Sequence, residues 1–381
     1  MKLPPEAGMA ELAAEAARLL RMREKDILSL RLLRRSVDAR EEVRLVYTVE
    51  VAVKEESAIL RRARSRKISR AAQAPAYTPP SPLPAPAVPP VVVGAGPAGL
   101  FAALVLAQAG LRPILLERGR PVERRKADVE RFWATGELDL TSNVQFGEGG
   151  AGAFSDGKLN TGTRDPRHRF ILETLLSCGA PEDILIDAKP HVGTDYLHTV
   201  LVNLRRRLLE LGTDIRFESR LADLDIRDGA LRGITAEGPE GVYTLPCSHL
   251  LLCPGHSARD TFAMLHQAGV PMEQKNFAVG VRIEHPQRLI DKAQYGKAAS
   301  HSALGAADYK LAVHLEDGRG VYTFCMCPGG FIVPAMTDAA QSVVNGMSPS
   351  GRTSPYANSG LVTEVRLDDF AHLRDEGGEL A

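Results

Sequence analysis

The stretch PPVVVGAGPAGLFAAL, residues 89–104, decides the fold because three valines run directly into the spacing GxGxxG. A strand followed by such a turn and then by an apolar helix is the arrangement that binds a dinucleotide. Gly94 permits the tight turn, Gly96 lets the backbone approach a pyrophosphate, and Gly99 lets helix and strand pack closely. The stretch therefore predicts an α/β fold with a parallel sheet and a phosphate site at the start of the helix.

The residues after the turn indicate which dinucleotide binds. Pro97 suits the first helical turn, and the unpaired N–H groups around Pro97 and Ala98 favour a phosphate. The next strand, PILLE, ends at Glu117, and Arg118 follows it. A carboxylate at this position accepts hydrogen bonds from ribose hydroxyls and disfavours a 2′-phosphate. We therefore expect NAD or FAD rather than NADP, with Arg118 beside Glu117 in the site.

A second glycine-rich segment, QFGEGGAGAFSDGK at residues 145–158, favours FAD. Its five glycines provide a backbone that can lie against a flat ring and present N–H groups. The alternative is a flexible surface loop, which is common for glycine-rich segments. No second strand, GxGxxG turn and helix occurs between residues 150 and 381, so a reductase with two dinucleotide-binding domains is disfavoured.

Composition indicates more than one domain in these 381 residues. Residues 71–90 contain eight prolines, which exclude a helix or a central strand and indicate an extended linker. Before the linker, 17 basic and 11 acidic residues accompany a helical pattern and two alternating stretches, which predicts a small α+β, ferredoxin-like module. We predict this module at 1–70, the linker at 71–90, a Rossmann-like FAD-binding domain at 91–270 and a largely antiparallel β substrate-side domain at 271–381.

Two local predictions concern the central domain. The segment 194–212 has helical spacing, with Thr194 as its N-cap and Gly212 as its end. The run HLLLC, residues 249–253, is continuously apolar, which is typical of a strand buried on both faces. Short antiparallel strands are expected between these two elements, around the turn at 227–230.

The sequence contains neither a membrane span nor a signal peptide pattern. Five cysteines, an odd number spread over a long chain, argue against a disulfide framework. We therefore expect a cytoplasmic protein with reduced thiols.

Four residues are candidates for catalysis. Cys325 and Cys327 are two apart on a predicted strand, so both are expected on one face, where a redox role and simple burial are both open. No nearby His or Cys completes a four-ligand set, so no metal is predicted. Lys158 could place a cation near a flavin, and His256 follows a strand at its carboxyl end, where such sheets bind ligands.

The motifs GAGPAGLFAAL, LERG, SNVQFGEGGAGAFSDGKL, HVGTDYL, LCPGHSARDTF and YTFCMCPGGF occur in order along the chain. Together they resemble the family of bacterial FAD-dependent proteins known as NAD(FAD)-utilizing dehydrogenases, over nearly the whole chain. The resemblance implies FAD held by a flavoprotein fold of the glutathione-reductase type. It also implies a further C-terminal segment with another glycine-rich turn, so we expect this chain to be a truncated member.

The resemblance also implies roles for particular residues. Gly94, Gly96, Gly99 and Glu117 would bind the ADP half of FAD. The segment Gly149, Gly150, Ala151 and Gly152 would approach the pyrophosphate and the flavin. Leu221 would lie where such folds pass the adenine, and Gly255 would let a strand end pack beside the dinucleotide.

The sequence thus predicts an FAD-dependent oxidoreductase that passes a hydride or electron pair between flavin and a small-molecule substrate. NAD(P)H is the candidate electron donor. One alternative is flavin-dependent modification of RNA, with the basic run at 61–70 as anchor, although that run lacks interleaved aromatics and we do not expect nucleic-acid binding. The other alternative is a flavin-binding fragment without catalysis.

Overall fold

The computed structural model describes residues 1–63, 65–71, 76–163 and 165–373. The chain divides into two units, each assembled from segments that are distant in sequence. The predicted four-part division stays a prediction, and parts of its linker (72–75) and last domain (374–381) lie outside the described residues. The N-terminal unit comprises Met1–Thr78, Lys158–Val192 and Gln287–Ala307, and the second unit comprises Pro79–Gly157, Gly193–Pro286 and Asp308–Ala381.

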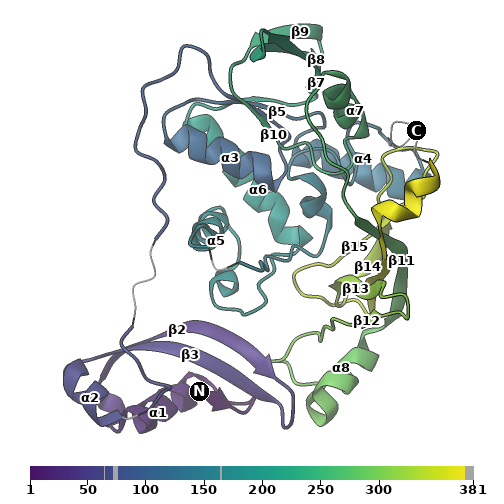
Figure 1. Ribbon diagram of the computed structural model, residues 1–381. Coiled ribbons are helices and arrows are strands. Elements are labelled where there is room, and N and C mark those ends of the chain that lie inside the picture. The colour runs from purple at the N-terminus through teal and green to yellow at the C-terminus, as the bar shows by residue number, and fades with distance from the viewer. Residues whose placement is uncertain (64, 72–75, 164, 374–381) are drawn as a thin grey trace. The chain divides into compact units, whose positions relative to one another are not determined.

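The N-terminal unit contains a three-stranded antiparallel sheet of order β1-β3-β2 (Figure 1). The long strands β2 (Ile27–Asp38) and β3 (Arg44–Val53) form a hairpin, and β1 (Lys2–Leu3) pairs with β3. Helices α1 (Met9–Leu20) and α2 (Glu56–Ala63) follow β1 and β3. This order is that of a ferredoxin-like fold without its last strand, as far as the described residues go. The predicted α+β character of this region is therefore confirmed, while its bounds at 1–70 stay a prediction.

Later segments complete this unit. Val43 and Leu45 pack with Leu304 in a small core, and Arg35 Nε donates to Asp187 Oδ1 at 2.8 Å. The unit's other elements are η1 (Glu24–Asp26), α5 (Arg167–Ser177), η3 (Glu182–Leu185), α8 (Gln287–Tyr295) and η4 (Gly296–Ala298).

The second unit is built on a four-stranded parallel sheet of order β10-β4-β5-β6. Because all three valines of β4 are buried, this strand forms the centre of the core. Helix α3 (Pro97–Gln108) packs on β4, β5 and β10, as a strand-turn-helix unit requires. The predicted parallel α/β fold is therefore confirmed. The strands are β4 (Val91–Val93), β5 (Ile114–Leu116), β6 (Asp214–Arg216) and β10 (Leu250–Leu252).

A three-stranded antiparallel sheet, β7-β8-β9, covers the parallel sheet through a shared core. Val91 and Val93 pack there with Leu221, Ile234 and Ala236. The strands are β7 (Arg220–Arg227), β8 (Ala230–Gly238) and β9 (Gly241–Pro246), and the helical elements of this region are α4 (Val122–Thr135), η2 (Gly150–Phe154), α6 (Thr194–Glu210) and α7 (Arg259–Gln267).

Two local predictions are wrong in this region. Strand β10 is not buried on both faces, because it is the edge of the sheet and Leu252 is 38% exposed. An apolar run does not by itself distinguish an edge strand from a central one. Thr194 is the first residue of α6 rather than its N-cap, which is Gly193 with φ +81.

A four-stranded antiparallel sheet of order β11-β16-β13-β12 follows, as predicted from residue 270 onward. The prediction that Cys325 and Cys327 share a face is wrong, because a β-bulge interrupts the strand between Phe324 and Cys327 and Cys325 has φ +47. The elements are β11 (Phe277–Pro286), β12 (Ala312–His314), β13 (Gly320–Cys327), β14 (Phe331–Pro334), β15 (Val344–Met347), β16 (Tyr356–Val365) and η5 (Leu367–Leu373).

Among the described helices, none combines the length and the apolar character that crossing a membrane would require.

Candidate dinucleotide-binding site

A cavity of about 580 Å³ lies in the second unit at the carboxyl ends of β4, β5 and β10. This is the position and size expected of a ligand site in an open parallel sheet. The sequence-predicted residues that line it are Gly94, Gly96, Pro97, Ala98, Glu117, Arg118, Gly150, Ala151, Gly152, Leu221, Gly255 and His256.

The first wall of this cavity is the turn from β4 into α3. Gly94 has φ +97, and a Cβ there would lie 2.2 Å from the carbonyl oxygen of Cys253. A Cβ on Gly99 would lie 1.7 Å from the carbonyl oxygen of Gly94. Helix α3 starts with Pro97 after Gly96, without a side-chain cap, so its first N–H groups are available to an anion.

The second wall is formed by residues 143–152, which include most of the glycine-rich segment and pack directly against the first turn. A Cβ on Gly150, which has φ +58, would lie 3.0 Å from Gly96 Cα. The N–H of Gly149 donates to the carbonyl oxygen of Ala95 at 2.8 Å. Phe146, Ala153 and Phe154 of the glycine-rich segment are buried, so the alternative of a surface loop is wrong for it.

The Glu117 carboxylate joins the two walls. Its Oε1 accepts from the N–H groups of Gly119 at 2.9 Å and Gly147 at 3.0 Å. Its Oε2 accepts from the N–H of Ala95 at 2.7 Å. Because Oε2 has one partner, it retains a lone pair for a ribose hydroxyl, while the carboxylate also holds the backbone on both sides of the cavity.

Arg118 is held in place at the cavity by its neighbours. Its Nη2 donates to Asp260 Oδ1 at 2.9 Å and to Thr261 Oγ1 at 3.0 Å. Its guanidinium lies over the Phe146 ring, 4.3 Å from the centroid. The arrangement fixes a planar cation beside Glu117, between the start of α7 and the glycine-rich segment.

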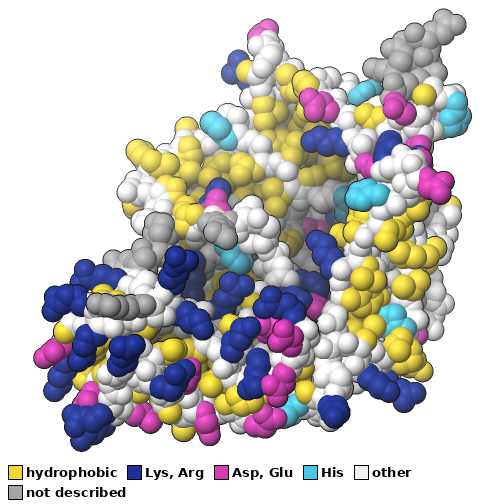
Figure 2. Space-filling model, turned by 60° about the horizontal axis from the view of Figure 1, so that its bottom comes forward, with side chains coloured by type: hydrophobic (Ala, Val, Ile, Leu, Met, Phe, Trp, Pro, Cys, Tyr) yellow, Lys and Arg dark blue, Asp and Glu magenta, His cyan; other side chains and the backbone are white. Residues whose placement is uncertain are grey.

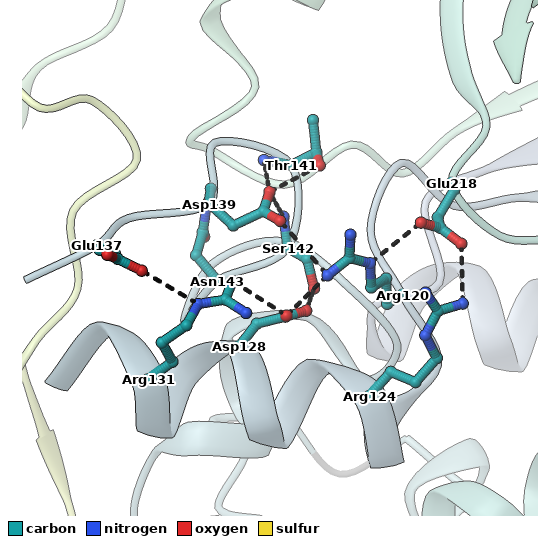
Figure 3. Close-up of polar contacts among 10 residues, drawn as sticks. All are labelled: Arg120, Arg124, Asp128, Arg131, Glu137, Asp139, Thr141, Ser142, Asn143 and Glu218. Atoms are coloured by element: carbon teal, nitrogen blue, oxygen red, sulfur yellow. Dashed lines mark hydrogen bonds and ion pairs between the residues drawn. The ribbon is translucent and has the colours of Figure 1, made fainter. Parts of the chain in front are cut away.

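A polar network secures the loop that precedes the second wall (Figure 3). Asp128 on α4 is 4% exposed and accepts from Arg120 Nη1 at 2.7 Å. Its other oxygen accepts from Ser142 Oγ, also at 2.7 Å. Arg120 Nε donates to Glu218 Oε1 at 3.0 Å, which joins the same network to the segment between β6 and β7. The loop is therefore fastened to two separate elements.

Two further buried charged residues near the second wall, Arg125 and Glu148, were not predicted from the sequence. Arg125 is fully buried, and burial lowers the pKa of its guanidinium to about 10. Glu148 is 1% exposed, and burial raises its pKa to about 7, although bonds from Val122 N and Arg205 Nη1 act in the opposite direction. A signal for Arg125 was present, because it stands in the apolar stripe of α4 with Val129.

Of the four candidate catalytic residues, one lines the cavity. His256 lines the cavity, with Nε2 at 3.3 Å from Ser257 Oγ. Lys158 belongs to the N-terminal unit. Cys325 and Cys327 lie on β13, where Cys327 Sγ is buried and donates to the Cys325 carbonyl oxygen at 3.3 Å. Their roles stay predictions.

Family models match three parts of the chain. Residues 87–129 match an FAD binding domain, and residues 276–379 match the C-terminal-domain-like family of FAD-dependent proteins. Residues 1–54 match a domain of unknown function. The first match covers the β4 turn, α3 and Glu117.

Two curated relatives match at different lengths. An uncharacterized protein of Clostridium beijerinckii is 46% identical over 354 residues, covering 92% of this chain and 66% of the relative. A 12-dehydrotetracycline 5-monooxygenase/anhydrotetracycline 6-monooxygenase of Streptomyces rimosus is 32% identical over 174 residues, covering 43% of this chain and 30% of that enzyme. The chain thus spans less than two thirds of either relative.

Solved structures with detectable similarity include a flavoprotein/dehydrogenase from Cytophaga hutchinsonii, at 11% identity and a TM-score of 0.38, covering 76% of this chain and 58% of that one. A glycerol-3-phosphate dehydrogenase from Bacillus halodurans complexed with FAD has 10% identity and a TM-score of 0.35, covering 74% of this chain and 48% of that one.

The parallel sheet, its glycine turns and the family matches define a dinucleotide-binding flavoprotein of the Rossmann type. The cofactor is FAD. The cavity fits such a group, since the absent Cβ atoms of Gly94 and Gly150 leave backbone at its surface and the free end of α3 faces it.

Proposed function

We propose that this protein is an FAD-dependent oxidoreductase of the NAD(FAD)-utilizing dehydrogenase kind. Bound FAD would supply the acceptor and donor of a hydride or electron pair exchanged with a small-molecule substrate. The proposal rests above all on one observation: two glycine turns abut at Gly96 and Gly150 and line a single cavity with Glu117.

The residues of the chain would bind and orient the cofactor. The uncapped first turn of α3 would hold the pyrophosphate through backbone N–H groups. Glu117 Oε2 would accept from a ribose hydroxyl while keeping its bond from Ala95. Leu221, with Leu265 and Met272, would form the apolar wall for the adenine.

Among the candidate catalytic residues, His256 is supported by its place at the cavity. A neutral or charged imidazole there could exchange a proton with a bound ligand. Lys158, Cys325 and Cys327 remain candidates on the sequence argument alone. The rate of flavin reduction, measured in His256→Ala and Cys325→Ser chains, would test two of these candidates. The rate should fall in the variant that removes a catalytic group.

An absorption spectrum of the purified chain, followed by anaerobic titration with NADH and then NADPH, tests the proposal. We expect a visible flavin band that bleaches with one of the two donors. A chain that remains colourless after incubation with FAD would refute cofactor binding. A flavin band that neither donor bleaches would favour the alternative of a flavin-binding fragment without catalysis.

Oxygen dependence separates two kinds of oxidoreductase. The Streptomyces rimosus relative is a monooxygenase, and its matched segment supports the oxidoreductase class. Nicotinamide oxidation that continues over many turnovers without O₂, when another electron acceptor is supplied, would favour a dehydrogenase. Nicotinamide oxidation that stops after one equivalent per flavin and resumes only when O₂ is admitted would favour a monooxygenase.

RNA modification is the less favoured alternative. Figure 2 shows Lys and Arg side chains gathered at the lower left of that view with Asp and Glu among them. In the N-terminal unit, Arg31 pairs with Glu50 and Arg35 with Asp187, which reduces the positive field available to phosphates. Salt-sensitive RNA binding by the full chain, weakened by charge-removing changes at Arg61 and Arg62, would support this alternative.

A further inference from the structure

Arg125 on α4 is a fully buried cation whose partners are almost all backbone carbonyl groups. Its Nε donates to the carbonyl oxygen of Asn143 at 2.9 Å, and its Nη2 donates to that of Val144 at 3.0 Å. Its Nη1 donates to the carbonyl oxygens of Glu148 at 2.6 Å and Gly147 at 3.3 Å. One side chain therefore collects four carbonyls of the loop that forms the second wall.

The charge of Arg125 has no direct ion pair, although the carboxylates of Glu117 and Glu148 attract it from a greater distance. Among the described residues, no carboxylate oxygen lies within ion-pair distance of its guanidinium, and the Phe154 ring lies 4.9 Å away. A buried cation without a direct ion pair is costly for a fold. Such a cost is tolerated where the charge orders its surroundings or serves a ligand.

The bonds from Arg125 set the orientation of the peptide units in this loop. In the peptide unit between Glu148 and Gly149, the carbonyl points to Arg125 and the N–H donates to Ala95 O at 2.8 Å. Each carbonyl turned toward the guanidinium turns its peptide N–H away from it. A Cβ on Gly147 would lie 2.4 Å from Arg125 Cδ, so glycine is required where the arginine passes.

We propose that Arg125 is a positioning residue for FAD: it gathers the carbonyls of four residues between 143 and 148, so that the backbone of Ala151 and Gly152 presents its N–H groups to the pyrophosphate. The buried positive charge adds an attraction for the two phosphates. This inference rests on the proposed binding of FAD, and it assigns the shape of the second wall to one side chain that does not line the cavity.

Two substitutions at Arg125 and one neighbouring control test the proposal. Arg125→Met keeps the bulk and removes the charge and donors, whereas Arg125→Lys keeps the charge with fewer donors in a different geometry. Arg124→Met is the matched control, because Arg124 is exposed on the same helix and pairs with Glu218. Kd values for FAD would be measured by flavin fluorescence, and those for ADP and adenosine by competition with FAD.

We expect FAD to bind about 30-fold more weakly to Arg125→Met and about 5-fold more weakly to Arg125→Lys, with Arg124→Met unchanged. The loss should appear for ADP and be much smaller for adenosine, which has no phosphate. A residue that only stabilises the fold would lower the unfolding temperature without changing the preference for ADP over adenosine.

Three results would overturn the proposal while leaving FAD binding intact. The first is wild-type FAD affinity in Arg125→Met. The second is an equal loss of ADP and adenosine affinity in either variant. If Arg125→Met does not fold, Arg125→Lys decides, and unchanged FAD affinity there is the third. Failure of the wild-type chain to bind FAD would instead refute the proposed function.

Discussion

The two walls of the cavity present backbone to the cofactor in different ways. The wall at Gly94–Gly99 is shaped by the absence of side chains, since a Cβ on Gly99 would overlap the Gly94 carbonyl. The wall formed by residues 143–152 is shaped by buried charged side chains, with Glu117 holding an N–H and Arg125 holding carbonyls. The shape of the first wall is therefore set by steric contacts and that of the second by electrostatic interactions. Both walls bring backbone N–H groups to one site.

The difference predicts how each wall fails. A steric wall should fail abruptly when one methyl group is added, because backbone atoms cannot move away cheaply. A wall held by electrostatic interactions should lose stability gradually, because several hydrogen bonds hold it and each contributes a limited free energy. Substitutions in the two walls therefore test the comparison directly.

Gly99→Ala should have the largest effect. The added Cβ would lie 1.7 Å from the Gly94 carbonyl oxygen, so β4 and α3 must separate. We expect the free energy of unfolding to fall by at least about 3 kcal/mol and FAD binding to be lost. Urea denaturation and flavin content measure both.

Gly320→Ala is the control for this change, because a Cβ there has open space and its φ is not positive. Equal stability of Gly99→Ala and Gly320→Ala would contradict the steric account of the first wall.

Glu117→Gln should have the second largest effect and acts on both walls. The amide NH₂ would oppose one of the three backbone N–H donors that the carboxylate now accepts. Leaving a buried donor without an acceptor costs about 2 kcal/mol. We expect this loss in urea denaturation without cofactor, together with weaker FAD binding.

Glu123→Gln is the matched control, because Glu123 is exposed and pairs with Arg205. If both Gln variants kept wild-type stability, Glu117 would not join the walls in the way its bonds indicate.

The steric wall could be predicted from the sequence, and the reason is local. Gly94, Gly96 and Gly99 act through their own backbone, so their spacing alone predicts the turn between β4 and α3 and the packing of these two elements. The same holds for Glu117, whose position at a strand end is set by the strand.

The electrostatic wall could not be predicted, because its bonds join side chains to backbone far along the chain. Arg125 reaches carbonyls 18 to 23 residues away, and only the folded loop brings them to it. The bulge at Cys325 was missed for a related reason, since one extra residue in a strand leaves no mark in an alternating pattern.

Gly150→Ala should have a smaller effect than either change above. Gly150 has φ +58, which is unfavourable for alanine, and its Cβ would press on Gly96 Cα at 3.0 Å. We expect a loss of roughly 1 to 2 kcal/mol in unfolding free energy and reduced FAD affinity. Gly152→Ala is the control, since its Cβ would meet Pro97 Cγ at an ordinary 3.8 Å. A larger loss of stability in Gly152→Ala would show that the walls do not meet at Gly150.

The pH dependence of stability provides the finest test, and it concerns the electrostatic wall alone. Burial raises the pKa of Glu148 to about 7, so the folded chain binds a proton that the unfolded chain releases above its ordinary pKa near 4.5. This contribution is complete below pH 4.5 and is lost as pH rises through 7, because the unfolded state then binds fewer protons than the folded state.

Between pH 6 and 8 the wild-type chain should therefore lose about 1 kcal/mol that Glu148→Gln does not lose. Urea denaturation of both chains at pH 6, 7 and 8 measures the difference. Glu123→Gln should lose less than the wild type over this range, because the charge of Glu123 is one of the causes that raise the pKa of Glu148. Parallel curves for wild type and Glu148→Gln would mean that Arg205 keeps Glu148 ionised, and that the second wall rests on a full ion pair beside Arg125.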